Sequence, residues 1–184
     1  LFNDMDIQKI EFSSKNNLSF NVNKSLKFDN FKIESIIDLN QIIINPKNLN
    51  LKTYFPSFID EIKLEKHKII INYNKNKFKI KGNGKILLKD KLDDLSYQII
   101  KDNMKISFDT KINLKNNSLL IDFLDYEKKE GLSSFVTIKG NLKKNNLLRL
   151  DLIKVKAKNN IILIKGLDLS KKYKIIDIKN FNID

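Results

Sequence analysis

The sequence lacks most of the residues that would tie it to a reactive centre. Its 184 residues include no cysteine, no tryptophan, two methionines, one histidine and one arginine. Without cysteine, neither a disulfide framework nor a thiolate metal site can form, and the redox compartment stays open. Long apolar runs are also missing, since none approaches the roughly 18 residues of a membrane span.

The first residues, Leu1 to Met5, do not read as a targeting signal. A secretory signal needs a basic region followed by an apolar one, and neither is present. We therefore expect the chain to be cut from a longer protein, with any anchor or signal outside it.

The composition that remains is that of a folded protein. Hydrophobic residues make up 41% of the chain and charged residues 31%, and the hydrophobic residues are largely Ile, Leu and Phe. Disordered chains contain few β-branched and aromatic residues. A chain of this length can bury a core as one domain or as part of a larger one.

The formal net charge of +13 raises the possibility of a nucleic-acid or anionic-membrane partner. Against nucleic acid, Arg149 is the only arginine, and arginine is the residue suited to bidentate phosphate and guanine contacts. The lysines are spread along the chain, and A/T-rich codons favour Lys, Asn and Ile together. We expect no nucleic-acid partner, and we interpret the lysines as genome bias and as an outer sheet face that discourages edge pairing.

Long amphipathic β-strands are the main structural signal. In residues 105–114, Ile106, Phe108, Ile112 and Leu114 share one parity, whereas lysine and other polar residues take the other. Side chains alternate across a strand, so this period of two predicts one apolar and one polar face. From about Phe78 to Leu169, Asn- and Lys-rich turns recur roughly every 13 to 16 residues, a spacing wider than in compact sandwiches.

Turn signals predict where the strands end. Asn74-Lys75-Asn76 predicts a hairpin turn, and Gly82-Asn83-Gly84 predicts another because glycine tolerates positive φ. Residues 118–126 are predicted to form one strand. Residues 60–66 are the best helical segment, of about two turns.

The first part of the chain contains shorter strand signals, at residues 7–12, 17–22 and 25–40. A change of parity at Asp29-Asn30 indicates a bulge or turn. Pro56 breaks the pattern and predicts a short helical or irregular turn. We place an internal boundary there, which divides the chain into an N-terminal β segment (1–54) and a second segment (55–184). Whether the first segment continues the same sheet is left open at this level.

The predicted fold is therefore all-β: a long antiparallel meander with little helix. An amphipathic sheet without covering helices has three options, which are packing on another sheet, closing into a barrel, or curling into a groove that holds a non-protein ligand. We favour the curled groove and keep the β-sandwich and the closed barrel as alternatives.

Residues for catalysis or metal binding are sparse. His67 lies between two lysines, which is typical of a surface residue, and metal sites normally need several converging ligands. We interpret Asp93-Asp94 as a solvated loop or a strand end and not as a catalytic dyad, because adjacent strand residues would point to opposite faces. The pairs Asp60-Glu61 and Asp122/Asp125, and Ser133-Ser134, show no catalytic pattern. We expect no enzyme, no metal and no cofactor.

Two segments carry a resemblance to a known family. Residues 119–129 (Leu-Leu-Ile-Asp-Phe-Leu-Asp-Tyr-Glu-Lys-Lys) resemble a strand-end pattern of the AsmA-like proteins of the Gram-negative envelope. Residues 77–86 (Lys-Phe-Lys-Ile-Lys-Gly-Asn-Gly-Lys-Ile) look like their recurrent element of a strand, Gly-x-Gly and a second strand. The similar region runs from about Lys52 to the C-terminus.

The resemblance implies a function. AsmA-like proteins are anchored in the inner membrane and extend through the periplasm as a curled β-sheet, an architecture shared with eukaryotic bridge-like lipid transfer proteins. An apolar groove carries phospholipid acyl chains towards the outer membrane, and the family has no catalytic residues. This chain would be periplasmic, anchored through a segment outside it. The lipid-facing residues that the resemblance implies are Phe78, Ile80, Ile106, Phe108, Ile112, Leu114, Leu119, Ile121, Phe123, Val136 and Ile138.

Alternatives remain open at this level. In residues 119–126 the opposite parity is apolar too, through Leu120, Leu124 and Tyr126, so the inward assignment is weakest there. Each lipid-facing residue could instead be a core residue of a closed sheet. The chain could then be an envelope assembly protein without lipid, or a basic nucleic-acid binder whose affinity falls steeply with salt.

Overall fold

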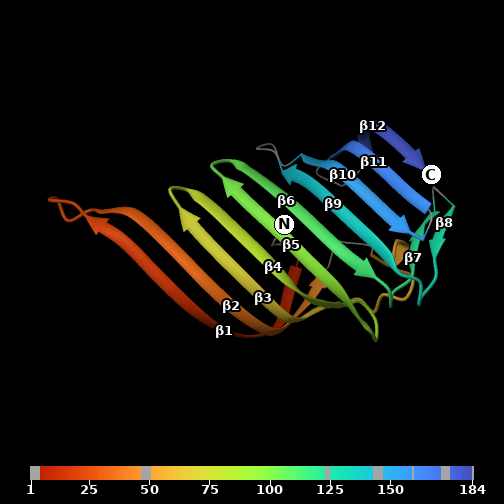
Figure 1. Cartoon of the computed structure of the whole chain (residues 1–184), viewed down its shortest axis with the longest axis horizontal. Helices are drawn as coiled ribbons and strands as arrows, with labels where there is room; N and C mark the ends of the chain where they lie inside the picture. Colours follow the sequence, from red (N-terminus) through yellow and green to blue (C-terminus); the bar gives the residue numbers. More distant parts are fainter. Residues whose placement is uncertain are drawn as a thin grey trace.

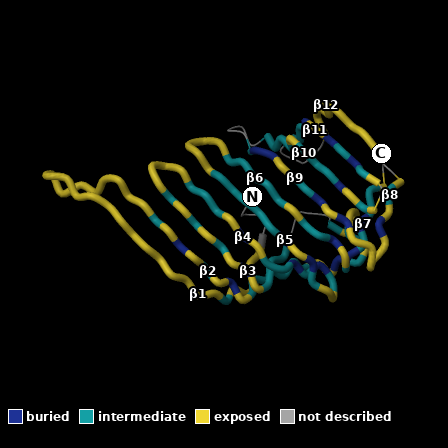
Figure 2. Tube along the Cα trace, viewed as in Figure 1, coloured by how far each residue is buried: buried dark blue, intermediate teal, exposed yellow. Residues whose placement is uncertain are grey.

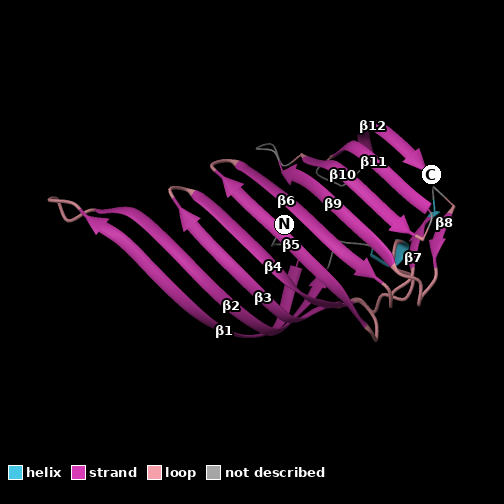
Figure 3. Cartoon of the chain, in the orientation of Figure 1, coloured by secondary structure: helices cyan, strands magenta, loops and turns pink. Residues whose placement is uncertain are grey.

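The structure is a computed structural model that describes residues 5–46, 51–122, 125–142, 147–158, 160–170 and 175–183. Ten strands form one antiparallel sheet, and each strand pairs with the next one along the chain except where β7 and β8 intervene (Figures 1 and 3). The strands are β1 (Met5–Val22), β2 (Phe28–Pro46), β3 (Ile62–Asn74), β4 (Lys77–Leu87), β5 (Leu92–Asp102), β6 (Lys105–Leu114), β7 (Leu119–Ile121), β8 (Tyr126–Lys128), β9 (Ser134–Leu142), β10 (Leu148–Ala157), β11 (Asn160–Leu169) and β12 (Ile175–Ile183).

The predicted open meander is confirmed. Among the described residues, β1 and β12 are the two edges of the large sheet and do not pair with each other, so the sheet is not a closed barrel. A short 3₁₀ turn, η2, lies at Leu51–Thr53. The N-terminal strands belong to the same sheet, because β2 pairs with β3 from Lys32↔Asn74 to Ile44↔Ile62.

Several predicted turns are confirmed. The β3–β4 hairpin turns at Lys75 and Asn76, whose φ values are 45° and 66°. Two consecutive positive φ values are typical of the turn that matches strand twist. The bulge predicted at Asp29-Asn30 is present: Asn30 has φ 52° and the β1–β2 register shifts opposite it.

The turn predicted at Gly82-Asn83-Gly84 is wrong, because these residues lie inside β4. Gly82 pairs with Tyr97 of β5, and a Cβ added at Gly82 would lie 2.3 Å from the Tyr97 ring. A Cβ added at Gly84 would lie 2.3 Å from the His67 ring. The glycines therefore make room for two neighbouring rings and do not turn the chain.

The helix predicted over residues 60–66 is also wrong, because β3 begins at Ile62. The periodicity there is disturbed by a bulge: Lys66 has φ 52° and the β3–β4 register shifts between Glu65 and Lys68. An extra residue in one strand moves the apolar parity by one position, and a short window then resembles helical spacing.

The single strand predicted over residues 118–126 is instead two short strands. β7 and β8 pair with each other as a separate sheet, and Asp125, with φ 48°, lies in the turn that precedes β8. The β7–β8 hairpin packs against the end of the large sheet and does not extend it. Apolar side chains on both faces of the hairpin can therefore be buried, which accounts for apolar residues of both parities in this segment.

Register separates the sheet into two faces. One row across the sheet runs Leu95↔Ile112↔Val136↔Val155↔Ile162, and we call this side the apolar face. The adjacent residues face the other way, as in the row Ile70↔Lys81↔Gln98↔Asp109↔Lys139, and we call that side the lysine face. Directly paired residues project to the same side of a sheet.

The core covers one end of the apolar face. Residues 51–60 together with β7 and β8, which we call the plug, contribute Phe58 and Leu119 to the same buried cluster as Leu95 and Leu114. One backbone bond joins its two parts, from Leu120 N to Tyr54 O at 2.9 Å, and another joins it to the residue after β4, from Ile59 N to Leu88 O at 3.3 Å. Figure 2 shows the buried residues concentrated towards this end and the exposed residues along β1. In the described part of the chain, no helix has the length and apolarity to cross a membrane.

Candidate functional site

Eight of the eleven residues proposed from the sequence lie on the apolar face. They come from three strands of the large sheet, and the register through β5 places them on one side: Phe78 and Ile80 of β4, Ile106, Phe108, Ile112 and Leu114 of β6, and Val136 and Ile138 of β9. Leu119 and Ile121 belong to β7 in the plug, and Phe123 lies outside the described residues.

The eight residues divide into two groups. Leu114 and Val136 are buried in the core cluster, and Ile112 and Ile138 pack against it. The plug covers this part of the apolar face, with Leu119 buried and Ile121 packed against the same cluster. These residues are therefore protein core in this structure.

The second group lies towards the hairpin turns that follow β3 and β5. Phe78, Ile80, Ile106 and Phe108 are each partly exposed and are outside the core cluster, as is Ile99, which pairs with both Ile80 and Phe108. We call this region the open half of the apolar face. It is the part of the face on which a ligand could lie without displacing the plug.

The apolar face is also exposed at both edges. On β1, Ile7, Ile10, Phe12 and Leu18 are each about half exposed, and on β12 the same holds for Phe181 and Ile183. Their partners on β2 and β11, such as Leu39 opposite Phe12 and Ile164 opposite Phe181, lie on the apolar face. Large apolar side chains on an uncovered face are typical of an interaction surface.

On the interior strands β3–β6 and β9–β11, two charged residues, Asp93 and Lys101, occupy positions on the apolar face. Asp93 lies at the plug end, where it is 2% exposed and accepts bonds from Lys115 N (2.9 Å), Asn116 N (2.8 Å) and Asn117 Nδ2 (2.7 Å). Lys101 lies at the opposite end, where it is exposed. Asp93 and Asp94 lie at the start of β5, which agrees with the strand-end alternative and not with the loop, and Asp93 is buried where a solvated residue was expected.

A buried lysine fastens the plug beside Asp93. The Lys128 ammonium donates to the backbone oxygens of Asn117 and of Lys115. Desolvation by burial lowers the pKa of Lys128, and the nearby carboxylates of Asp93 and Glu130 act in the opposite direction. A cation in such a position needs hydrogen-bond partners to offset the loss of water, which the two carbonyls supply.

The prediction that His67 is a surface residue is wrong. His67 is 1% exposed, and its Nε2 lies 3.0 Å from Lys85 O. Burial lowers the pKa of the imidazole, so the neutral form is favoured, with Nε2–H as donor and Nδ1 without a hydrogen-bond partner. The overlooked signal is parity, since His67, Ile69, Ile71 and Tyr73 alternate with polar or exposed positions along β3.

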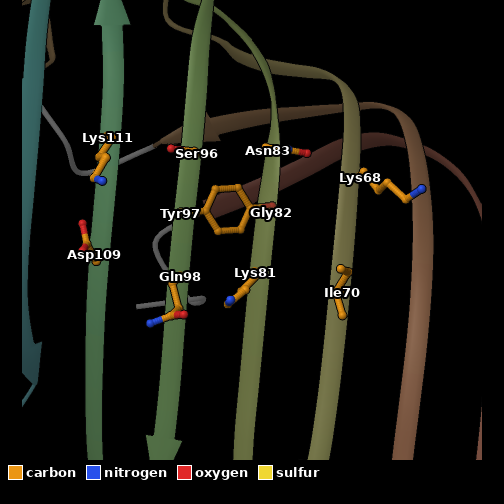
Figure 4. A pocket seen from close by; sticks show the side chains of 10 residues that line it. All are labelled: Lys68, Ile70, Lys81, Gly82, Asn83, Ser96, Tyr97, Gln98, Asp109 and Lys111. Atoms are coloured by element: carbon orange, nitrogen blue, oxygen red, sulfur yellow. The ribbon is translucent and has the colours of Figure 1, made fainter.

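The lysine face carries two shallow, adjoining depressions. The first, of about 400 Å³, is lined mainly by polar side chains of β3–β6, including Lys68, Lys81, Gln98 and Lys111 (Figure 4). Gly82 and Tyr97 also border this depression, although the register places the Tyr97 side chain on the apolar face beside His67. The second, of about 540 Å³, shares Asn83, Ser96 and Lys111 with the first. Both are open and carry mixed charge, since the Asp109 carboxylate of the first depression pairs with Lys139 at 2.9 Å.

Reactive groups do not gather at any of these places. The described residues contain no group of three or more His, Cys, Asp or Glu side chains able to hold a metal ion. The apolar face, with its partly exposed open half and the exposed Ile, Leu and Phe side chains of its edge strands, is the candidate site.

Comparison with protein-family models, with curated proteins and with solved structures found no match for this chain.

Proposed function

We propose that this chain is a non-enzymatic lipid-binding segment whose apolar face holds phospholipid acyl chains on their way between the inner and outer membranes. The observation that carries the proposal is the open half of the apolar face, where Phe78, Ile80, Ile99 and Phe108 form adjoining apolar surface outside the protein core. A curled sheet that is not closed leaves this surface accessible.

The chemistry of an acyl chain suits such a face. A chain needs continuous apolar contact and no polar partner, and burial stabilises it by about 0.8 kcal/mol per CH₂. Bound lipid would also cover the exposed Ile and Phe side chains of this face. Left in contact with water, such side chains favour aggregation.

The plug restricts where the lipid lies. Leu114 and Val136 are already buried by protein, so they would contribute to stability and make no contact with lipid. The lipid-facing set then consists of Phe78, Ile80, Ile106 and Phe108, joined by Ile99 and by the apolar residues of the edge strands. A periplasmic location with an anchor outside the chain belongs to the same proposal and rests on the AsmA-like strand pattern.

Lipid bound to the purified protein tests the proposal. Native mass spectrometry after gentle detergent removal, followed by thin-layer analysis of an organic extract, should reveal co-purified phospholipid. A protein that is lipid-free, folded and monomeric, and that takes up no phospholipid from vesicles, would contradict the proposal.

Three substitutions locate the lipid. Phe12→Asp on the apolar face and Phe135→Asp on the lysine face change residues of nearly equal exposure, 55% and 54%. Phe12→Asp and Phe108→Asp should lower the amount of bound lipid, whereas Phe135→Asp should not. Phe12 is exposed, so its substitution separates lipid loss from unfolding should Phe108→Asp fail to fold. Circular dichroism monitors folding, and equal lipid loss from all three variants would argue against the assignment.

The edge strands favour a second candidate, an envelope assembly protein without lipid. Their exposed apolar side chains suit strand addition by another protein, as do their outer edges, which pair with no other strand in the described part of the chain. This candidate predicts no bound lipid together with a stable protein complex in cross-linked envelope fractions.

A further inference from the structure

We infer that Lys101 binds the anionic head group of the lipid at the end of the open half farthest from the plug. This inference rests on the proposed function and names the substrate class, an amphiphile with a phosphate or carboxylate head group and an alkyl chain.

Lys101 occupies an apolar position. It pairs with Phe78 of β4 on one side and with Ile106 of β6 on the other, so its side chain projects from the apolar face between two apolar neighbours. The adjacent Asp102 projects to the lysine face, where it lies 3.7 Å from the Lys77 ammonium. No carboxylate among the described residues forms an ion pair with Lys101, which leaves its ammonium available.

The other charged residue on this face of the central strands cannot serve the same purpose. Asp93 is buried at the plug end and its carboxylate already accepts three N–H donors. The cation therefore lies at the open end of the face and the anion at the closed end. An anionic amphiphile would be oriented by this arrangement, with its head group at Lys101 and its chain directed towards the plug.

The dimensions agree with one alkyl chain. From Lys101 to Tyr97, where β5 begins to pack against the core cluster, four residues along the strand span about 13 Å. Half of the ~30 Å hydrocarbon layer of a bilayer is about 15 Å, the depth that one acyl chain fills. The lysine stem can lie along Phe78 and Ile106 while its ammonium stays in water and meets the head group.

Three probes with the same chain test the inference by isothermal titration calorimetry below their micelle concentrations: dodecyl phosphate, dodecanoate and dodecyl maltoside. The protein should bind the two anionic probes more tightly than the neutral one by about fivefold, the effect of a partly exposed ion pair. Lys101→Gln should abolish this preference and leave the affinity for dodecyl maltoside unchanged.

Lys105→Gln is the matched control, because Lys105 lies at the same end of the sheet, pairs with Asp102 and projects to the lysine face. It removes the same charge and should retain the preference. If both variants lose the preference for anionic probes equally, net charge is responsible and the inference is wrong.

The three probes also separate this inference from the proposed function. Equal binding of all three probes overturns the inference but leaves the proposed function standing, whereas failure of all three to bind overturns both. A higher affinity for dodecyl phosphate than for dodecanoate would assign the phosphate of a phospholipid, and equal affinities would assign anionic amphiphiles in general.

Discussion

At the scale of single residues, His67 shows how burial changes the chemistry of a side chain. The imidazole lies at the bulge of β3, beside the Tyr97 ring and Gly84 and next to Leu39, its cross-strand partner on β2. Its Nε2–H donates to Lys85 O. Tyr97 is the other titratable side chain in this environment, and burial raises the pKa of its hydroxyl. A protonated His67 would therefore place an uncompensated charge in an apolar site.

We predict that stability falls on acidification because of His67. Its pKa in the folded protein lies below the ordinary 6.5, so its contribution is fully present above pH 6.5. As the pH falls below 6.5 the unfolded chain takes up a proton that the folded protein resists, and the loss continues until the pH passes the lowered pKa. Urea unfolding between pH 8 and pH 5.5 measures this loss.

The variant His67→Gln serves as the comparison, because an amide can still donate to Lys85 O but does not titrate. Its free energy of unfolding should vary less with pH than that of the unmodified protein across this range. Equal pH dependence in both proteins would show that His67 is not responsible.

Asp93 and Asp94 are adjacent residues with different expected effects. Asp93→Ala leaves three buried or partly buried donors without an acceptor and should lower the free energy of unfolding by about 3 kcal/mol. Asp94→Ala removes an exposed pair with Lys85 and should cost less than about 1 kcal/mol. Chemical denaturation measures both, and similar values for the two variants would contradict the account of Asp93.

At the scale of elements, the plug converts part of an amphipathic sheet into a protein core. Phe58 is 5% exposed and the adjacent Ile59 is 53% exposed. Phe58→Ala should therefore lower the free energy of unfolding by about 3 kcal/mol, whereas Ile59→Ala should change it by about 0.5 kcal/mol or less. Thermal and urea unfolding test this difference, and a small effect of Phe58→Ala would mean that the plug is not part of the cooperative core.

The elements also show where sequence patterns are sufficient. The 105–114 strand was predictable because its alternation is uninterrupted, and the turn at Lys75-Asn76 because Asn tolerates positive φ. In contrast, the glycines of β4 were interpreted as a turn. Their role depends on Tyr97 and His67, which lie on different strands, and no local pattern contains that information.

At the scale of the whole molecule, the sheet has two long edges that the described residues leave unpaired. Exposed, apolar edge strands are templates for further pairing. We predict that lipid-free protein self-associates, and that Phe181→Lys on β12 reduces this association while Phe135→Lys, on an interior strand and the lysine face, does so less. Light scattering coupled to size-exclusion chromatography measures the mass. A protein that stays monomeric without lipid or detergent at high concentration would contradict the prediction.

The amino-acid sequence by itself determined that this protein is a long antiparallel meander with one apolar and one lysine-rich side, because a period of two is a local property of each strand. The tertiary structure alone decided how the apolar side is divided. Ile112, Leu114, Val136 and Ile138 lie on the same face as Ile80 and Phe108, yet the plug covers the first group and leaves the second partly exposed. Burial depends on which distant segment packs against a face, and alternation along a strand does not encode that contact.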